Sequence, residues 1–143
     1  MTVLASATIT SPLPASAFFD RWADMATWPE WNHDTEWVRL DGPFAEGATG
    51  VLKPKGGPKV PFTVTRLDDH SFVDESRLLG ARLVFDHRVS RTEDGTRVDV
   101  TVTLTGPLAP VWRLILGAGI VKTLQQDLDS LALAAGAGNH RQA

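Results

Sequence analysis

Alternating apolar and polar residues run through most of the first 105 positions and predict a chain rich in β-strands. In the first strand, at 2–10, one face is apolar and is expected to be buried; it carries Val3, Ala5, Ala7 and Ile9. Further strands are predicted at 35–40, 49–53, 60–67, 71–77, 81–91 and 97–105. Asp94-Gly95 is the strongest hairpin signal, and the short turns favour antiparallel neighbours.

Two short helices are predicted between the first and second strands. Phe18, Phe19, Trp22 and Met25 follow helical spacing and predict an amphipathic helix from about residue 15 to 24. Thr27 is then predicted to cap a single helical turn that carries Trp28 and Trp31.

The longest helical pattern extends from Pro110 to Ala134. Its apolar positions are three, four or seven residues apart and predict one buried face, formed by Val111, Leu114, Val121, Leu124, Leu128 and Leu131. The order of elements therefore predicts an α+β helix-grip fold, in which a curved antiparallel sheet of about seven strands wraps around a long C-terminal helix. We expect residues 1–143 to form one domain, with a flexible tail at about 136–143.

Composition narrows the classes of function. The net charge of -3 gives no general reason to expect nucleic-acid binding, and no segment is apolar enough for membrane insertion. The absence of cysteine excludes thiolate chemistry and fits a cytoplasmic location, as does an N-terminus unlike a signal peptide. The four histidines lack metal-ligand spacing, so neither a metal nor another cofactor is expected. The sequence leaves a homodimer open.

Several segments of the chain resemble the START-like, or Bet v 1-like, superfamily, and in particular bacterial proteins of the polyketide cyclase/dehydrase type. These segments are the N-terminal strand, Asp24 with Trp28-Pro29-Glu30-Trp31-Asn32, and the runs at 80–87, 94–98 and 104–108. The resemblance covers essentially the whole chain and implies the helix-grip fold. It also implies a small apolar ligand held between the long helix and the sheet, and it transfers no catalytic motif.

Large aromatic residues are candidates for the walls of such a cavity. The predicted ligand-binding residues lie in the second helical turn, on the strands and in the long helix: Trp31, Trp37, Phe62, Phe85, His87, Trp112, Leu116, Gly117 and Ile120. Trp22 is expected to fill the core. Gly117 and Gly119 each cost a helix about 1 kcal/mol relative to alanine, which suggests that they leave space for a ligand.

His87 is the main polar candidate, because strand alternation places it on the inner face with Phe85. If Leu79-Gly80 form the turn, Asp74 faces Phe85 and lies diagonally beside His87, whereas a shift by one residue would bring Glu75 inside. His87 with Asp74 is therefore the candidate acid/base pair.

Three functions remain open from the sequence. The first is a carrier or sensor that binds a small hydrophobic or amphipathic molecule, such as a lipid, polyketide or aromatic compound. The second is an enzyme of the cyclase or dehydratase type that uses His87 with a nearby carboxylate. The third is an interaction module whose cavity is filled by its own side chains.

Overall fold

A computed structural model describes the backbone of residues 2–142 and the side chains of residues 3–136. Seven strands and three helices follow one another in the order β1 (Thr2–Ser11), α1 (Ala15–Ala23), η1 (Met25–Glu30), β2 (Thr35–Asp41), β3 (Thr49–Pro54), β4 (Val60–Leu67), β5 (Ser71–Leu78), β6 (Ala81–Thr92), β7 (Gly95–Thr105) and α2 (Ala109–Gln142). The predicted strands are all present, and η1 is a 3₁₀-helix.

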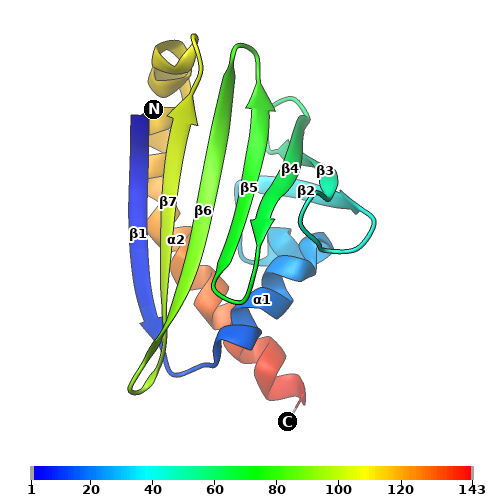
Figure 1. Cartoon of the computed structure of the whole chain (residues 1–143), viewed down its shortest axis with the longest axis vertical. Coiled ribbons are helices and arrows are strands. Elements are labelled where there is room, and N and C mark those ends of the chain that lie inside the picture. Colours follow the sequence, from blue (N-terminus) through cyan, green and yellow to red (C-terminus); the bar gives the residue numbers. More distant parts are fainter. Residues whose placement is uncertain (1, 143) are drawn as a thin grey trace.

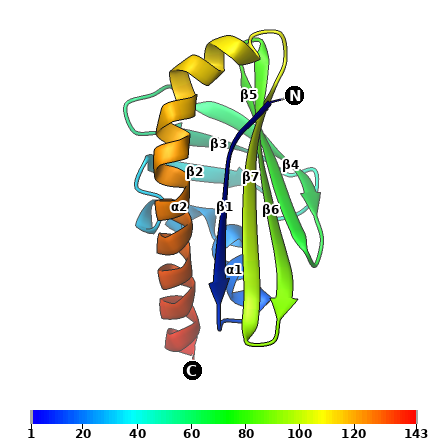
Figure 2. The same cartoon turned by 90° about the vertical axis from the view of Figure 1, so that its left-hand side faces the viewer.

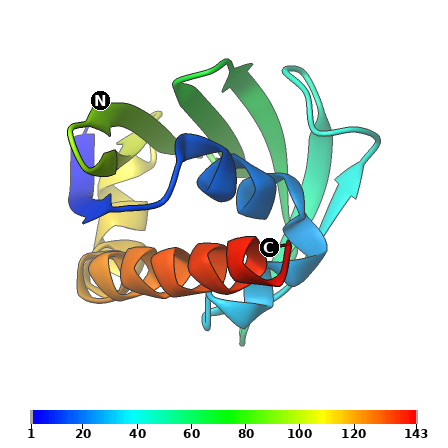
Figure 3. The same ribbon diagram turned by 90° about the horizontal axis from the view of Figure 1, so that it is seen from below.

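The strands form one antiparallel sheet in the order β1-β7-β6-β5-β4-β3-β2 (Figure 1). Consecutive strands from β2 to β7 are neighbours, as their short turns predict. The first strand joins the far edge beside β7, so α1 and η1 carry the chain across the sheet to β2 at the opposite edge. The sheet curls, and α1 and α2 lie on its concave side (Figure 3). The predicted helix-grip fold is confirmed.

The strand register at the β5–β6 turn, which sets the side chains of the candidate site, is the one predicted from the sequence. Leu78 pairs with Ala81, so Leu79-Gly80 form the turn as predicted. The Asp94-Gly95 hairpin is also present, but Thr92 pairs with Gly95, so the two linking residues are 93 and 94. A Cβ at Gly95 would clash with the backbone oxygen of Ser11, which explains the glycine.

The predicted face of α2 is buried only in the second half of the helix. Leu124, Leu128 and Leu131 are buried, whereas Val111, Leu114 and Val121 are exposed. The helix packs chiefly against β1 and α1. It also changes direction where its colour turns from yellow to orange (Figure 2), so its first turns lie at the end of the sheet. The predicted buried face is therefore wrong for the first half of the helix.

Three local predictions are also corrected. Val3 is 59% exposed, because the register shift between Val3 and Ala5 breaks the alternation of β1. Thr27 does not cap η1, which begins earlier at Met25; its hydroxyl donates a hydrogen bond to the Asp24 carbonyl instead. The helix predicted to end at Ala134 continues to Gln142, and most of the expected tail at 136–143 lies outside the residues whose side chains are described.

Candidate functional site

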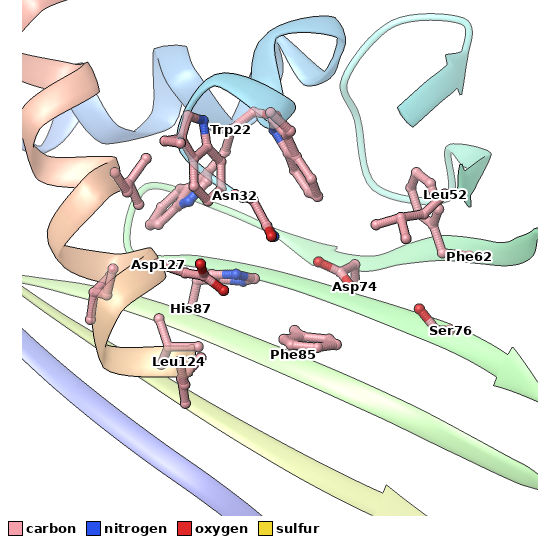
Figure 4. A pocket seen from close by; sticks show the side chains of 15 residues that line it. Trp22, Asn32, Leu52, Phe62, Asp74, Ser76, Phe85, His87, Leu124 and Asp127 are labelled. Atoms are coloured by element: carbon pink, nitrogen blue, oxygen red, sulfur yellow. The ribbon is translucent and has the colours of Figure 1, made fainter. Parts of the chain in front are cut away.

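A cavity of about 100 Å³ lies between the sheet, the helices α1 and η1, and the second half of α2 (Figure 4). Its lining is mostly apolar and consists of Trp22, Trp28, Trp31, Asn32, Leu52, Phe62, Asp74, Ser76, Phe85, His87, Val100, Leu124, Asp127, Leu128 and Leu131. Asn32, Leu52, Phe85 and Asp127 are only half-buried, so the cavity is not sealed from the surface.

Three tryptophans close the cavity on the side of the short helices. Trp22 is fully buried on α1 and packs against the rings of Phe72 and His87, with centroids 5.6 and 5.1 Å away. Trp28 lies in η1 and Trp31 is its C-cap residue; the centroids of their rings are 5.6 Å apart. The indole N–H groups of Trp22 and Trp31 are buried and make no hydrogen bond within the described part of the chain. Each such orphan donor costs about 1–3 kcal/mol.

The sheet contributes the polar side chains at the base of the cavity. Asp74 pairs with Phe85 and Phe72 pairs with His87, so the register predicted from the Leu79-Gly80 turn is confirmed. Asp74 is buried and lines the cavity, while Glu75 points away and forms an ion pair with Arg82 at 3.5 Å. Figure 4 shows Asp74, Ser76, Phe85 and His87 projecting from neighbouring strands into one space.

His87 is held in a defined orientation. Its Nδ1 lies 2.9 Å from the carbonyl oxygen of Phe72, and its ring stacks on the Phe72 ring at 4.7 Å. Because a carbonyl only accepts, Nδ1 carries the proton and Nε2 keeps a free lone pair. Burial lowers the pKa of His87 to about 4, although the bond to Phe72 and the charge of Asp86 act in the opposite direction. The imidazole is therefore neutral at pH 7 and can accept a proton.

Asp74 has the opposite perturbation. Burial alone raises the pKa of its carboxyl to about 7, since no hydrogen bond or ion pair reaches it from the side chains that the structure describes. Near neutral pH the carboxyl is therefore divided between its protonated and ionised forms. A proton donor and a neutral proton acceptor thus share one apolar cavity, an arrangement that can support acid/base chemistry.

A second carboxylate, which the sequence interpretation missed, stands at the rim. Asp127 projects from α2, and partial burial together with the charge of Asp34 raises its pKa to about 6, against a smaller opposing effect of His33. Helical spacing could have identified it, because Asp127 lies three residues after Leu124 and four before Leu131.

Of the predicted ligand-binding residues, Trp31, Phe62, Phe85 and His87 line this cavity, together with Asp74 from the acid/base pair. The other five do not: Trp37, Trp112, Leu116, Gly117 and Ile120. A β-bulge between Thr35 and Trp37 breaks the alternation of β2. Trp37 is left half-buried beneath Lys59, whose Nζ lies 5.9 Å from the ring centroid.

The residues predicted on the first half of α2 lie at the end of the sheet. The indole N–H of Trp112 donates to the Leu79 carbonyl at 2.8 Å, which fixes the ring against the β5–β6 turn. A Cβ at Gly117 would come within 3.9 Å of Leu4 on β1, and one at Gly119 would meet open space. The glycines therefore do not form the cavity wall, and Leu124, Asp127, Leu128 and Leu131 take that place.

Within the described residues there is no group of three or more histidine or acidic side chains that could hold a metal ion. None of the described helices is both long and apolar enough to cross a membrane.

The curved sheet gripping a long helix, with a cavity between them, defines the START-like class of helix-grip proteins. A family model described as polyketide cyclase/dehydrase and lipid transport matches residues 2–136, and the chain belongs to this family. No significant match is found among curated protein sequences.

Solved structures share the fold at low sequence identity. The protein TTHA0849 from Thermus thermophilus is 17% identical, with 94% of this chain and 97% of that chain covered and a TM-score of 0.70. Ara h 8.0201 is 12% identical, with coverages of 92% and 96% and a TM-score of 0.67. The di-domain ARO/CYC StfQ from the steffimycin biosynthetic pathway is 11% identical, with a TM-score of 0.75; 97% of this chain matches 52% of StfQ.

Proposed function

We propose that the protein binds a small apolar or amphipathic molecule in the cavity beneath α2, as a cytoplasmic carrier or sensor. The observation that carries this proposal is the mostly apolar cavity of about 100 Å³ into which His87 and Asp74 both project. Few polar groups in an otherwise apolar pocket are typical of small-molecule sites. The family assignment, which joins cyclases, dehydrases and lipid transport, supports the same conclusion.

The size of the cavity limits the ligand. A water molecule occupies about 30 Å³ of the liquid, and an engineered cavity of about 150 Å³ in another protein binds benzene. A space of about 100 Å³ is smaller than that, so it suits part of one small ring or the end of a longer chain that leaves past half-buried Asn32 and Asp127. A multi-ring polyketide would require the three tryptophans to move.

The polar groups of the cavity determine which hydrogen-bonding groups a ligand needs. Nε2 of His87 accepts a hydrogen bond, and protonated Asp74 donates one. A hydroxyl that donates to His87 and accepts from Asp74, or a hydroxyl together with a carbonyl, satisfies both partners. We therefore favour a phenol, a hydroxyketone or the head of a lipid-like molecule.

Native mass spectrometry of the protein purified from its own host tests the proposal directly, because a bound molecule adds its mass to the chain. Thermal unfolding with single-ring phenols, aromatic ketones and fatty acids provides the second test. A ligand at a hundred times its Kd stabilises the folded state by about 2.7 kcal/mol. The proposal fails if nothing co-purifies and no compound raises the melting temperature.

A pair of serine variants locates the binding. Ser76→Leu adds carbon atoms inside the cavity, whereas Ser90→Leu adds them on the exposed side of β6. We expect Ser76→Leu to abolish the ligand-induced stabilisation and Ser90→Leu to retain it. Equal effects of the two substitutions would place the ligand elsewhere.

The perturbed pKa values favour a second candidate, an enzyme of the cyclase or dehydratase type in which Asp74 donates and His87 accepts a proton. General acid/base groups contribute about 10²–10⁴ to a rate. We expect His87→Gln and Asp74→Asn each to reduce turnover of a compound identified in the binding tests by at least about a hundredfold. If both variants bind and turn over like the wild type, this candidate is excluded. The third possibility, an interaction module without a cavity, is disfavoured by the space beneath α2.

A further inference from the structure

One end of the molecule exposes apolar side chains. The most prominent are Leu79, at the tip of the β5–β6 turn, and Leu114 and Ile115 in the first half of α2, which are 80%, 87% and 62% exposed. Val121 and Val111 are 60% and 49% exposed. We call these five residues the apolar end. Single exposed apolar residues are normal in soluble proteins, whereas a contiguous group marks an interaction site.

The geometry brings the five residues of the apolar end to the same end of the molecule. At about 100° per residue, the four helical members fall within an arc of about 120° on one side of α2. The turn is fixed to the start of that helix, because Trp112 donates to the Leu79 carbonyl at 2.8 Å and the Leu108 amide donates to the Gly80 carbonyl at 2.9 Å. Figures 1 and 2 show the start of α2 and the β5–β6 turn at the same end of the molecule.

The other side of this helical segment is also apolar. Trp112, Leu116 and Ile120 are half-buried and pack against the hydrophobic core. A helical segment with apolar side chains on opposite sides is normally covered on both. The exposed side of α2 therefore indicates a partner that is absent from the isolated chain.

The charges near the apolar end indicate the kind of partner that covers it. Residues 100–126 contain no aspartate or glutamate but carry two basic residues, Arg113 and Lys122, although the whole chain has a net charge of -3. Lys122 lies within the apolar arc of the helix. Arg77 and Arg82 flank the turn that carries Leu79, but Asp41 and Glu75 line the same surface hollow as these two arginines. Within the part of the chain whose side chains are described, Arg113 and Lys122 form no ion pair, and Arg82 pairs with Glu75.

We propose that this end docks on an anionic lipid surface, with the first half of α2 lying in the interface. Such helices combine apolar side chains with lysine and arginine, and each basic residue near an anionic leaflet strengthens the attraction. A second copy of the chain fits less well, because a symmetric contact between two such helical segments would bring Arg113 and Lys122 of both copies together, and the segment carries no acidic residue to pair with them.

Co-sedimentation with vesicles tests the proposal without knowledge of the ligand. The wild-type chain is mixed with vesicles of phosphatidylcholine and phosphatidylglycerol in equal parts, and with vesicles of phosphatidylcholine alone. We expect binding to the anionic vesicles that is at least about tenfold stronger than to the neutral ones and that weakens as salt screens the charges. Equal binding to both, or binding to neither, overturns the proposal.

Matched variants locate the contact. The double variant Leu114→Ser with Ile115→Ser is expected to lower the partition coefficient by at least about tenfold, because binding scales with buried apolar area. Leu133→Ser is the control, since Leu133 is 78% exposed in the second half of the same helix. For the charge, Lys122→Glu is the test variant and Lys55→Glu is its control, because Lys55 lies in the β3–β4 loop. All replaced side chains are exposed, and circular dichroism verifies that the variants fold.

Two results would refute this assignment. One is that a control variant weakens vesicle binding as much as its test variant, that is, Leu133→Ser as much as the double serine variant or Lys55→Glu as much as Lys122→Glu. The other is that light scattering shows a dimer that the Leu114→Ser and Ile115→Ser substitutions dissociate, because a second copy would then occupy the apolar end.

Discussion

Replacing Asp74 with asparagine is expected to stabilise the protein at pH 7 and above and to have little effect below pH 4. Burial raises the pKa of Asp74 from its ordinary value of 3.8 to about 7 in the folded chain. Between these pH values the folded state retains a proton that the unfolded state has released, so the free energy of unfolding falls as pH rises. Asparagine has the same shape but cannot ionise, and it removes this loss.

The magnitude follows from the difference between the two pKa values. One pKa unit corresponds to about 1.36 kcal/mol, so the loss in the wild type reaches at most about 4 kcal/mol once the pH exceeds 7. It is absent below pH 4, where the carboxyl is protonated in both states. For a domain of this size, about 4 kcal/mol is a large part of a total stability of about 5–15 kcal/mol.

His87 contributes a slope of opposite sign. Burial lowers its pKa from 6.5 to about 4, so the unfolded state binds the extra proton and stability is lost as pH falls through that range, by about 3 kcal/mol. Between about pH 4 and 6.5 the contributions of His87 and Asp74 cancel in the wild type. Asp127, with a pKa raised to about 6, acts in the same direction as Asp74, but solvent screening reduces its effect because it is half-exposed.

Urea unfolding from about pH 4 to 8 reveals this balance. The Asp74→Asn variant should gain stability as pH rises to about 6.5 and then level off, while the wild type stays nearly flat and then declines. Asp94→Asn, in the exposed β6–β7 turn, is the control and should follow the wild type. If the difference in stability between Asp74→Asn and the wild type does not change with pH, the argument from burial is wrong.

Three further predictions follow from the packing of the chain and from the charge of the cavity. Trp22→Ala should reduce the free energy of unfolding by about 3–5 kcal/mol in urea, because the side chain is fully buried. Gly119→Ala should raise it by about 0.5–1 kcal/mol, since its Cβ meets open space in a helix, whereas Gly95→Ala, whose Cβ would clash with Ser11, should lower it. In thermal shift assays a phenol should stabilise the protein more than the matching benzoate above pH 7; the reverse order would show that the ligand brings a charge. The reason is that no lysine or arginine lines the cavity, so a carboxylate finds no positive charge there.

The strands and their register were predictable because β-structure has a period of two and the turns are short. Once Leu79-Gly80 were assigned to the turn, the inward positions of Asp74 and His87 followed from counting. The same counting misplaced Trp37, because a bulge inserts one residue into β2 and reverses the alternation. Nothing in the local sequence marks this bulge. Trp22 was assigned to the core and is indeed fully buried, but it also lines the cavity.

The long helix was harder to interpret, because periodicity shows that a face is apolar but not what covers it. Leu128 and Leu114 lie on the same predicted stripe, yet one is buried under the sheet and the other is exposed beyond its end. Where a helix passes the end of a sheet depends on the curvature of all seven strands, which no local pattern encodes. Gly117 and Gly119 fall on this overhanging part, so the space expected beside them is not the cavity.

The ionisable groups of the cavity also restrict the charge of its ligand. The fifteen lining residues include two carboxyls and one imidazole but no lysine or arginine. At pH 7 His87 is neutral and Asp74 is partly ionised, so the site offers no positive charge to an anion. An anionic ligand would have to bring a proton or lose its hydration without compensation, which is costly in an apolar space. A neutral molecule that donates to His87 and accepts from protonated Asp74 avoids that cost.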